Sequence, residues 1–110
     1  MTFRLNEDLK RSTKTASHTL TLEDLGTIVE FNSASNLTLT IPDDSAVDFP
    51  DGAQIVIARY GTGTVQVSAP GSAVFRSSEG NTFLTNQYSL ATLIKRTTNE
   101  WYLVGDLSAS

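Results

Sequence analysis

Apolar and polar side chains alternate along much of the chain with a period of two. The clearest case is residues 37–41, Leu-Thr-Leu-Thr-Ile, where every second residue is apolar. Because successive side chains of a β-strand point to opposite faces, this alternation predicts a half-buried strand with one face in water. Pro42 ends the strand, since proline cannot donate a hydrogen bond to a sheet ladder.

Two stretches are apolar on both alternating sides. They are residues 54–60, QIVIARY, and residues 88–106, YSLATLIKRTTNEWYLVGD. In the second stretch the polar segment 96–100 contains Asn99, a residue suited to left-handed turn geometry, so the pattern predicts a β-hairpin that returns along 101–104. We expect this hairpin to be the structural centre of the domain, with any surplus apolar face in contact with another subunit.

Shorter apolar runs separated by turn residues predict the remaining strands. These runs lie at 19–22, 27–32, 64–68, 73–75 and 82–84, and Gly61 and Gly63 predict a tight hairpin turn before 64–68. No segment has a convincing helical period. The sequence therefore predicts an all-β fold, a compact antiparallel β-sandwich or barrel-like domain of about eight or nine short strands over residues 19–110. Residues 1–18 are expected to form an irregular N-terminal arm.

Length and composition fit one globular domain. The chain has 110 residues, of which 39% are hydrophobic and 18% charged, and it has no cysteine. Disulfides and thiolate metal sites are therefore excluded. No apolar run is long enough for a membrane span or a signal peptide, so we expect a soluble protein made in a cytoplasm.

Charge divides the chain into a basic arm and an acidic body. Residues 1–18 hold four basic residues against two acidic ones, and residues 19–110 hold four basic residues against ten acidic ones. The basic residues of the arm are the candidate docking residues, Arg4, Lys10, Arg11 and Lys14. A solvated tail is the alternative; nucleic-acid binding is the weakest interpretation, because two acids offset this small basic set.

Catalytic chemistry is not indicated. His18 is the only histidine, and no nucleophile or carboxylate forms a recognised motif with it. Four aspartates, at 43, 44, 48 and 51, could in principle bind Ca²⁺, but their spacing does not match the EF-hand loop. We therefore expect a protein that is not an enzyme and has neither a metal nor a cofactor.

Four aromatic residues are candidates for recognition, for a subunit interface or for the core. They are Tyr60, Tyr88, Trp101 and Tyr102. Together they could form a carbohydrate-stacking patch, although aromatics in strands more often pack in the core or across strands. Because Trp101 and Tyr102 are consecutive in a strand, their side chains face opposite ways, and one of them meets a second sheet, a loop or another subunit.

Three stretches together resemble a small β domain of tailed-bacteriophage virion proteins. They are TLTLEDLGTIVEFNSASNLTLTIP (19–42), FPDGAQIVIARYGTGTVQV (49–67) and YSLATLIKRTTNEWYLVGDL (88–107). The resemblance implies a structural virion protein that forms a homotrimer, and it carries over no catalytic residue. In that family the domain often ends longer tail or fibre proteins, and related small β proteins occur on capsid surfaces.

The resemblance leaves two virion roles open. Only about 18 residues precede the domain, and none resembles a fibre shaft, which favours a capsid decoration (cement) protein whose arm docks on the major capsid protein. The alternative is a tail or fibre-associated module that binds a host-surface receptor or glycan. A binding domain outside a virion is the third hypothesis. Neither virion role requires a membrane or a nucleic acid.

Overall fold

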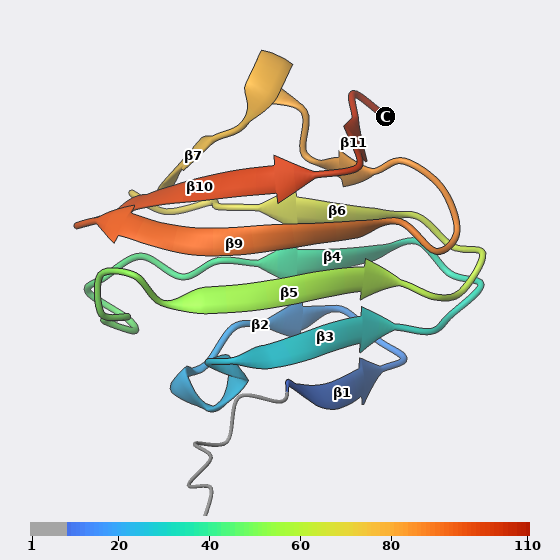
Figure 1. The fold of residues 1–110 in the computed structure, drawn as a ribbon, viewed down its shortest axis with the longest axis horizontal. Coiled ribbons are helices and arrows are strands. Elements are labelled where there is room, and N and C mark those ends of the chain that lie inside the picture. Colours follow the sequence, from blue (N-terminus) through green and yellow to red (C-terminus); the bar gives the residue numbers. More distant parts are fainter. Residues whose placement is uncertain (1–8) are drawn as a thin grey trace, which may run out of the picture.

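The computed structural model describes residues 9–110, which form two stacked mixed β-sheets (Figure 1). The six-stranded sheet has the order β1-β3-β5-β9-β10-β7, and the five-stranded sheet has the order β11-β8-β6-β4-β2. The strands are β1 (Lys10–Lys14), β2 (His18–Thr19), β3 (Thr27–Phe31), β4 (Leu37–Thr40), β5 (Gln54–Arg59), β6 (Val65–Ser68), β7 (Val74–Arg76), β8 (Phe83–Leu84), β9 (Leu90–Thr97), β10 (Glu100–Gly105) and β11 (Leu107–Ser108). Two 3₁₀ turns, η1 (Leu22–Asp24) and η2 (Ser78–Gly80), interrupt the connections. The all-β prediction is confirmed, and of the two expected forms, sandwich and barrel-like, the structure has two stacked sheets.

The first six strands form three stacked rungs. In each rung the chain runs along the six-stranded sheet, turns, and continues in the five-stranded sheet: β1 to β2, β3 to β4, and β5 to β6. Ile28 pairs with Val56 and Leu37 pairs with Val65, so both strands of the second rung match the third at an offset of 28 residues. The two rungs are an internal structural repeat, and both end in proline, at Pro42 and Pro70.

The expectation of an antiparallel sandwich is wrong in part, because many of the strands pair in parallel. Of the nine strand pairings within residues 9–110, five are parallel and four are antiparallel, so the sandwich is mixed rather than antiparallel. The predicted hairpin across Gly61 and Gly63 is wrong, because β5 and β6 lie in different sheets. A Cβ atom at Gly63 would lie 1.9 Å from the Ser35 carbonyl oxygen, so glycine is needed there for close stacking of the rung turns.

The predicted hairpin at 88–106 is present and lies in the six-stranded sheet between β5 and the edge strand β7. Strands β9 and β10 pair antiparallel and β9 also pairs with β5, while Asn99 has a φ of 53° at the turn. Residues 10–14, expected to be irregular, form strand β1 against β3, so they belong to the sandwich. The structure also has eleven strands in its described part instead of eight or nine, because several are only two or three residues long.

The core lies between the two sheets. It is built from the inward-facing residues of the alternating strands, among them Val29, Phe31, Leu39, Ile55, Ile57, Val67, Leu93, Trp101 and Leu103. Phe49 closes one end of it, with 2% of its surface exposed. Because successive side chains of a strand point to opposite faces, the residues between these inward positions point out to the surface.

Candidate interaction surface

The outer faces of the two sheets differ in chemistry. On the five-stranded sheet the outward positions of β4 and β6 are Thr38, Thr40, Gln66 and Ser68. On the six-stranded sheet the outward positions of β3, β5, β9 and β10 include Glu30, Gln54, Arg96 and Glu100, but the others form a set that is apolar apart from Thr92: Ile28, Val56, Ala58, Leu90, Thr92, Ile94, Tyr102 and Val104. We call this second set the apolar face. The two outer faces therefore suit different surroundings, water for one and a packing partner for the other.

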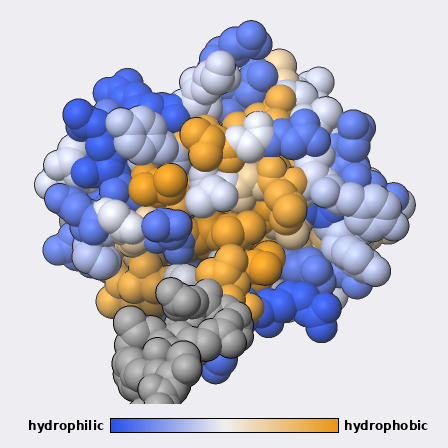
Figure 2. Space-filling view, viewed as in Figure 1, coloured by the Kyte–Doolittle hydropathy of each residue, from blue (hydrophilic) through white to orange (hydrophobic). Residues whose placement is uncertain are grey.

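The apolar face is continuous across strands. The registers align Ile28, Val56, Thr92 and Val104 in one row that crosses four neighbouring strands. Figure 2 shows hydrophobic residues gathered over the middle of this side of the molecule. Leu90 is 53% exposed and Val104 is 48% exposed, although these residue types are usually buried. Large exposed apolar patches mark interaction sites.

Charged residues lie at two opposite corners of this face. Near the β7–β10 edge, Glu100 accepts a hydrogen bond from Arg76 at 2.7 Å and one from Arg96 at 2.8 Å. The hydrogen bond from Arg76 is the main cause that lowers the pKa of Glu100 below its usual value. Glu30 lies at the opposite corner, beside the Thr13 hydroxyl at 3.5 Å, and within residues 9–110 it makes no ion pair. The first corner is thus net positive, and the second carries the Glu30 carboxylate with Arg11 on the outward side of the neighbouring strand β1.

Tyr60 and Tyr88 extend the apolar face at the end of β5 and β9. Their ring centroids are 5.6 Å apart in an edge-to-face arrangement, and the rings are 50% and 68% exposed. Tyr88 has a φ of 74°, a left-handed conformation that is unfavourable for a bulky side chain. The neighbouring Arg59 points the other way and donates to the Leu84 and Thr85 carbonyl oxygens. The pair is therefore a surface feature that the fold holds in place at some cost in backbone strain.

The other two predicted aromatics separate. Trp101 is fully buried and packs edge-to-face on Phe49, with ring centroids 5.3 Å apart, so it is a core residue and not part of a stacking patch. Tyr102 points outward on the apolar face and is 42% exposed. The expectation that the two consecutive side chains face opposite ways is confirmed.

The predicted docking residues occupy an edge strand. Lys10, Arg11 and Lys14 all belong to β1, the outer strand of the six-stranded sheet, and Arg4 lies outside the described residues. In register with β3, Arg11 lies on the outer side with Ile28, whereas Lys10 and Lys14 lie on the side of Thr27 and Phe31. The three cations therefore line an edge of the sandwich and do not form a patch on one face. Lysines on an edge strand also discourage uncontrolled strand pairing.

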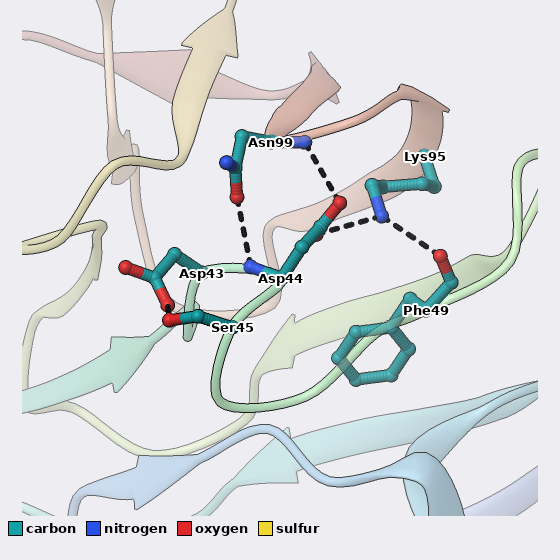
Figure 3. A network of polar contacts seen from close by, with 6 residues as sticks. All are labelled: Asp43, Asp44, Ser45, Phe49, Lys95 and Asn99. Carbon is teal, nitrogen blue, oxygen red and sulfur yellow. Dashed lines mark hydrogen bonds and ion pairs between the residues drawn. The ribbon is translucent and has the colours of Figure 1, made fainter.

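A buried lysine network was not singled out from the sequence. Figure 3 shows Lys95 reaching under the 43–52 connection, where its ammonium donates to Asp44 at 2.9 Å and to the Phe49 carbonyl oxygen at 2.8 Å. Asp44 also accepts from the backbone N–H of Asn99, and the Asn99 side chain accepts from the backbone N–H of Asp44. The sequence indicates that Lys95 is buried, because Lys95 lies on the same side of the strand as Ala91 and Leu93.

The polar contacts of His18 and Asp43 stabilise local structure. His18 lies 2.9 Å from Asp24, whose carboxylate also accepts from the backbone N–H of Thr21 at the start of η1. Asp43 is held by the Ser45 hydroxyl, which is the main cause that lowers the pKa of Asp43. No set of three acidic or histidine side chains within residues 9–110 is arranged to hold a metal ion, and none of the helical segments there could span a membrane.

A shallow cleft of about 270 Å³ lies between η2 and the end of β10. Its lining includes Ser78, Glu79, Asn81, Val104 and Leu107. Glu79 is its one carboxylate, so the cleft has no acid–base pair of the kind that hydrolytic chemistry uses. The apolar face, the Tyr60–Tyr88 pair and the basic edge strand are therefore the features that a partner could recognise. Comparisons with protein-family models, curated proteins and solved structures give no match.

Proposed function

We propose that this protein is a structural component of a bacteriophage virion, a capsid decoration protein that is not an enzyme. The apolar face carries this proposal, because a small β-sandwich with one apolar outer face is suited to assembly with other protein surfaces. The resemblance of residues 19–107 to virion β domains supplies the context. The surfaces described above fit a binding role, and the polar clusters are used within the fold.

Docking on the major capsid protein is assigned to the N-terminal segment, through Arg4 and the cations of β1. A basic edge strand suits an acidic partner surface, since opposite charges steer association and fix the orientation of the complex. The structure changes how this should be tested. Removing residues 1–17 would remove β1 and uncover β3, so loss of binding by that deletion would not separate docking from folding.

Charge substitution tests the docking role while keeping the backbone of β1. The docking variant carries Lys10→Gln, Arg11→Gln and Lys14→Gln, and the control carries Thr38→Glu, Thr40→Glu and Gln66→Glu on the polar face of the other sheet. Both variants change the net charge by the same amount. We expect the docking variant to bind purified undecorated capsids at least about 10-fold more weakly than the control. Equal binding by the two variants, or no binding by the wild-type protein, would refute the proposal.

The Tyr60–Tyr88 pair favours a second candidate, a tail or fibre-associated module that binds a host-surface glycan. Exposed aromatic rings offer apolar faces for sugar rings and hydroxyl groups for hydrogen bonds. A glycan array probed with the wild-type protein and with Tyr60→Ala tests this role. Binding that is lost in Tyr60→Ala would support the receptor role over the capsid role, and absence of any glycan binding would refute it.

A further inference from the structure

Strand β1 is the longest of the strands that lie at an edge of the two sheets. Within residues 9–110 it has five residues, whereas the other edge strands, β7, β2 and β11, have three, two and two. Its pairing with β3 runs in continuous register from Lys10 to Lys14, and it contains no proline. Figure 1 shows β1 as the outermost strand of its sheet. A regular edge of this length is a template on which another strand can pair.

The backbone of β1 presents hydrogen-bonding groups on its outer side. The Lys14 carbonyl oxygen accepts from the backbone N–H of Asn32 at 2.9 Å, so the backbone groups of Lys14 point toward β3. Because the backbone groups of successive strand residues point to alternate sides, those of Ser12 also point toward β3, and those of Arg11 and Thr13 point away from it. Within residues 9–110 these outward groups make no hydrogen bond. The N–H and C=O groups of both residues are therefore available to an added strand.

The side chains of β1 indicate the chemistry of the strand that fits this edge. Lys10, Arg11 and Lys14 are all cationic, and in the described part of the chain none of them forms an ion pair. Glu30 is the carboxylate of the neighbouring strand β3 and offsets only one of these charges, so the edge stays net positive. A second copy of β1 would place like charges opposite each other, which is destabilising. An acidic strand would instead place opposite charges there.

We propose that β1 docks by strand addition: an extended, acidic segment of the partner pairs with its outer edge and joins the six-stranded sheet. This inference rests on the proposed docking of the N-terminal segment on the capsid, and it adds the mode of binding and the chemistry of the partner segment. Main-chain hydrogen bonds to Arg11 and Thr13 provide affinity, and carboxylates opposite the cations provide specificity. The cations that discourage pairing with a second copy then favour this partner.

Two variants of Thr13 test whether the outward N–H takes part in binding to purified undecorated capsids. Both Thr13→Val and Thr13→Pro remove the hydroxyl that lies 3.5 Å from Glu30, but only Thr13→Pro also removes the N–H. The ladder to β3 is kept, because this N–H points away from it, and proline is tolerated on the outer side of an edge strand. We expect Thr13→Pro to bind at least about 10-fold more weakly than Thr13→Val, because the added strand loses a hydrogen bond and meets the proline ring. Equal binding by the two variants would overturn strand addition.

Amide hydrogen exchange of the wild-type protein tests the same contact without a substitution. The protein is labelled free or bound to capsids, released, and read by NMR. In the free protein the Ser12 amide should exchange more slowly than those of Arg11 and Thr13, because only Ser12 donates to β3. On capsids the Arg11 and Thr13 amides should slow by at least about 10-fold. Unchanged exchange at both amides would overturn the proposal, even if circular dichroism shows that Thr13→Pro does not fold.

The glutamine variant of the three β1 cations separates this inference from the docking proposal. If that variant binds capsids weakly while Thr13→Pro binds like Thr13→Val, the protein docks through charge alone and strand addition is wrong. If the glutamine variant binds as well as the wild-type protein, the partner segment is not acidic and the inference fails in its chemistry. If the wild-type protein does not bind capsids, the docking proposal and this inference are both wrong.

Discussion

Lys95 provides the sharpest test of how the fold is held together. Its side chain is 1% exposed, and its ammonium bonds Asp44 and the Phe49 carbonyl oxygen while lying 5.5 Å from the centre of the Trp101 ring. These contacts join β9 to the 43–52 connection, which leads from the second rung to the third. Loss of the ammonium should therefore destabilise the connection as well as the hairpin.

The expected magnitudes follow from which charge is left behind. Asp44→Asn leaves a buried ammonium without its carboxylate, which costs about 3–5 kcal/mol. Lys95→Met keeps the volume and leaves Asp44, whose side chain is 15% exposed and still accepts from Asn99, so we expect about 2–3 kcal/mol. The double variant removes both charges and should cost less than the sum of the single variants by about 2 kcal/mol.

Urea unfolding, followed by tryptophan fluorescence, measures these differences. With a slope of about 1–3 kcal/mol per M, the single variants should lower the midpoint by about 1–5 M. Arg96→Met is the matched control, because Arg96 is the next residue, points outward, and has a side chain that is 50% exposed in its pair with Glu100. If Lys95→Met costs no more than Arg96→Met, or if the single effects simply add, the buried pair does not hold the connection.

Three further predictions test the core, the stacked turns and the charged corner. Trp101→Ala should cost about 3–5 kcal/mol in urea unfolding followed by circular dichroism, because the ring is fully buried, and a folded, fully stable variant would contradict its core role. Gly63→Ala should lower the melting temperature more than Gly26→Ala, since a Cβ atom at Gly63 would lie 1.9 Å from the Ser35 carbonyl oxygen, whereas at Gly26 it meets nothing within 4 Å and alanine there costs only the strain of a φ of 67°. The lowered pKa of Glu100 means that its interactions stabilise the fold above its usual pKa of 4.5 and are lost as the pH falls below that value. The difference in melting temperature between wild type and Glu100→Gln should therefore shrink between pH 6 and pH 3, and a constant difference would contradict this.

The strands and the hairpin could be predicted from the sequence, because the alternation of a strand and the turn residues of a hairpin lie within a short stretch of neighbouring residues. The alternation at 37–41 gave β4, and the apolar run with Asn99 at its turn gave β9 and β10. The expected surplus apolar side of this hairpin is present as the outward side of β9 and β10, and its contact with another subunit stays a prediction. Lys95 could be assigned to the inward side from the period of two, but its partner Asp44 is 51 residues away, and no local pattern identifies such a pair.

Pairing between strands could not be predicted in the same way, because the alternation that identifies a strand is equally compatible with a parallel or an antiparallel neighbour. Gly61 and Gly63 suggested a hairpin turn, yet neither has a positive φ, and both lie where the turn of the third rung stacks on Ser33 to Ser35. The sequence did contain a signal for stacking: residues 27–42 and 55–70 align at the 28-residue offset and end in proline. In a hairpin the numbers of two paired residues have a constant sum, whereas in stacked parallel rungs they have a constant difference. A constant offset therefore favours stacked rungs over hairpins. The same constant register places Ile28 beside Val56, and with them the row of side chains at the centre of the apolar face.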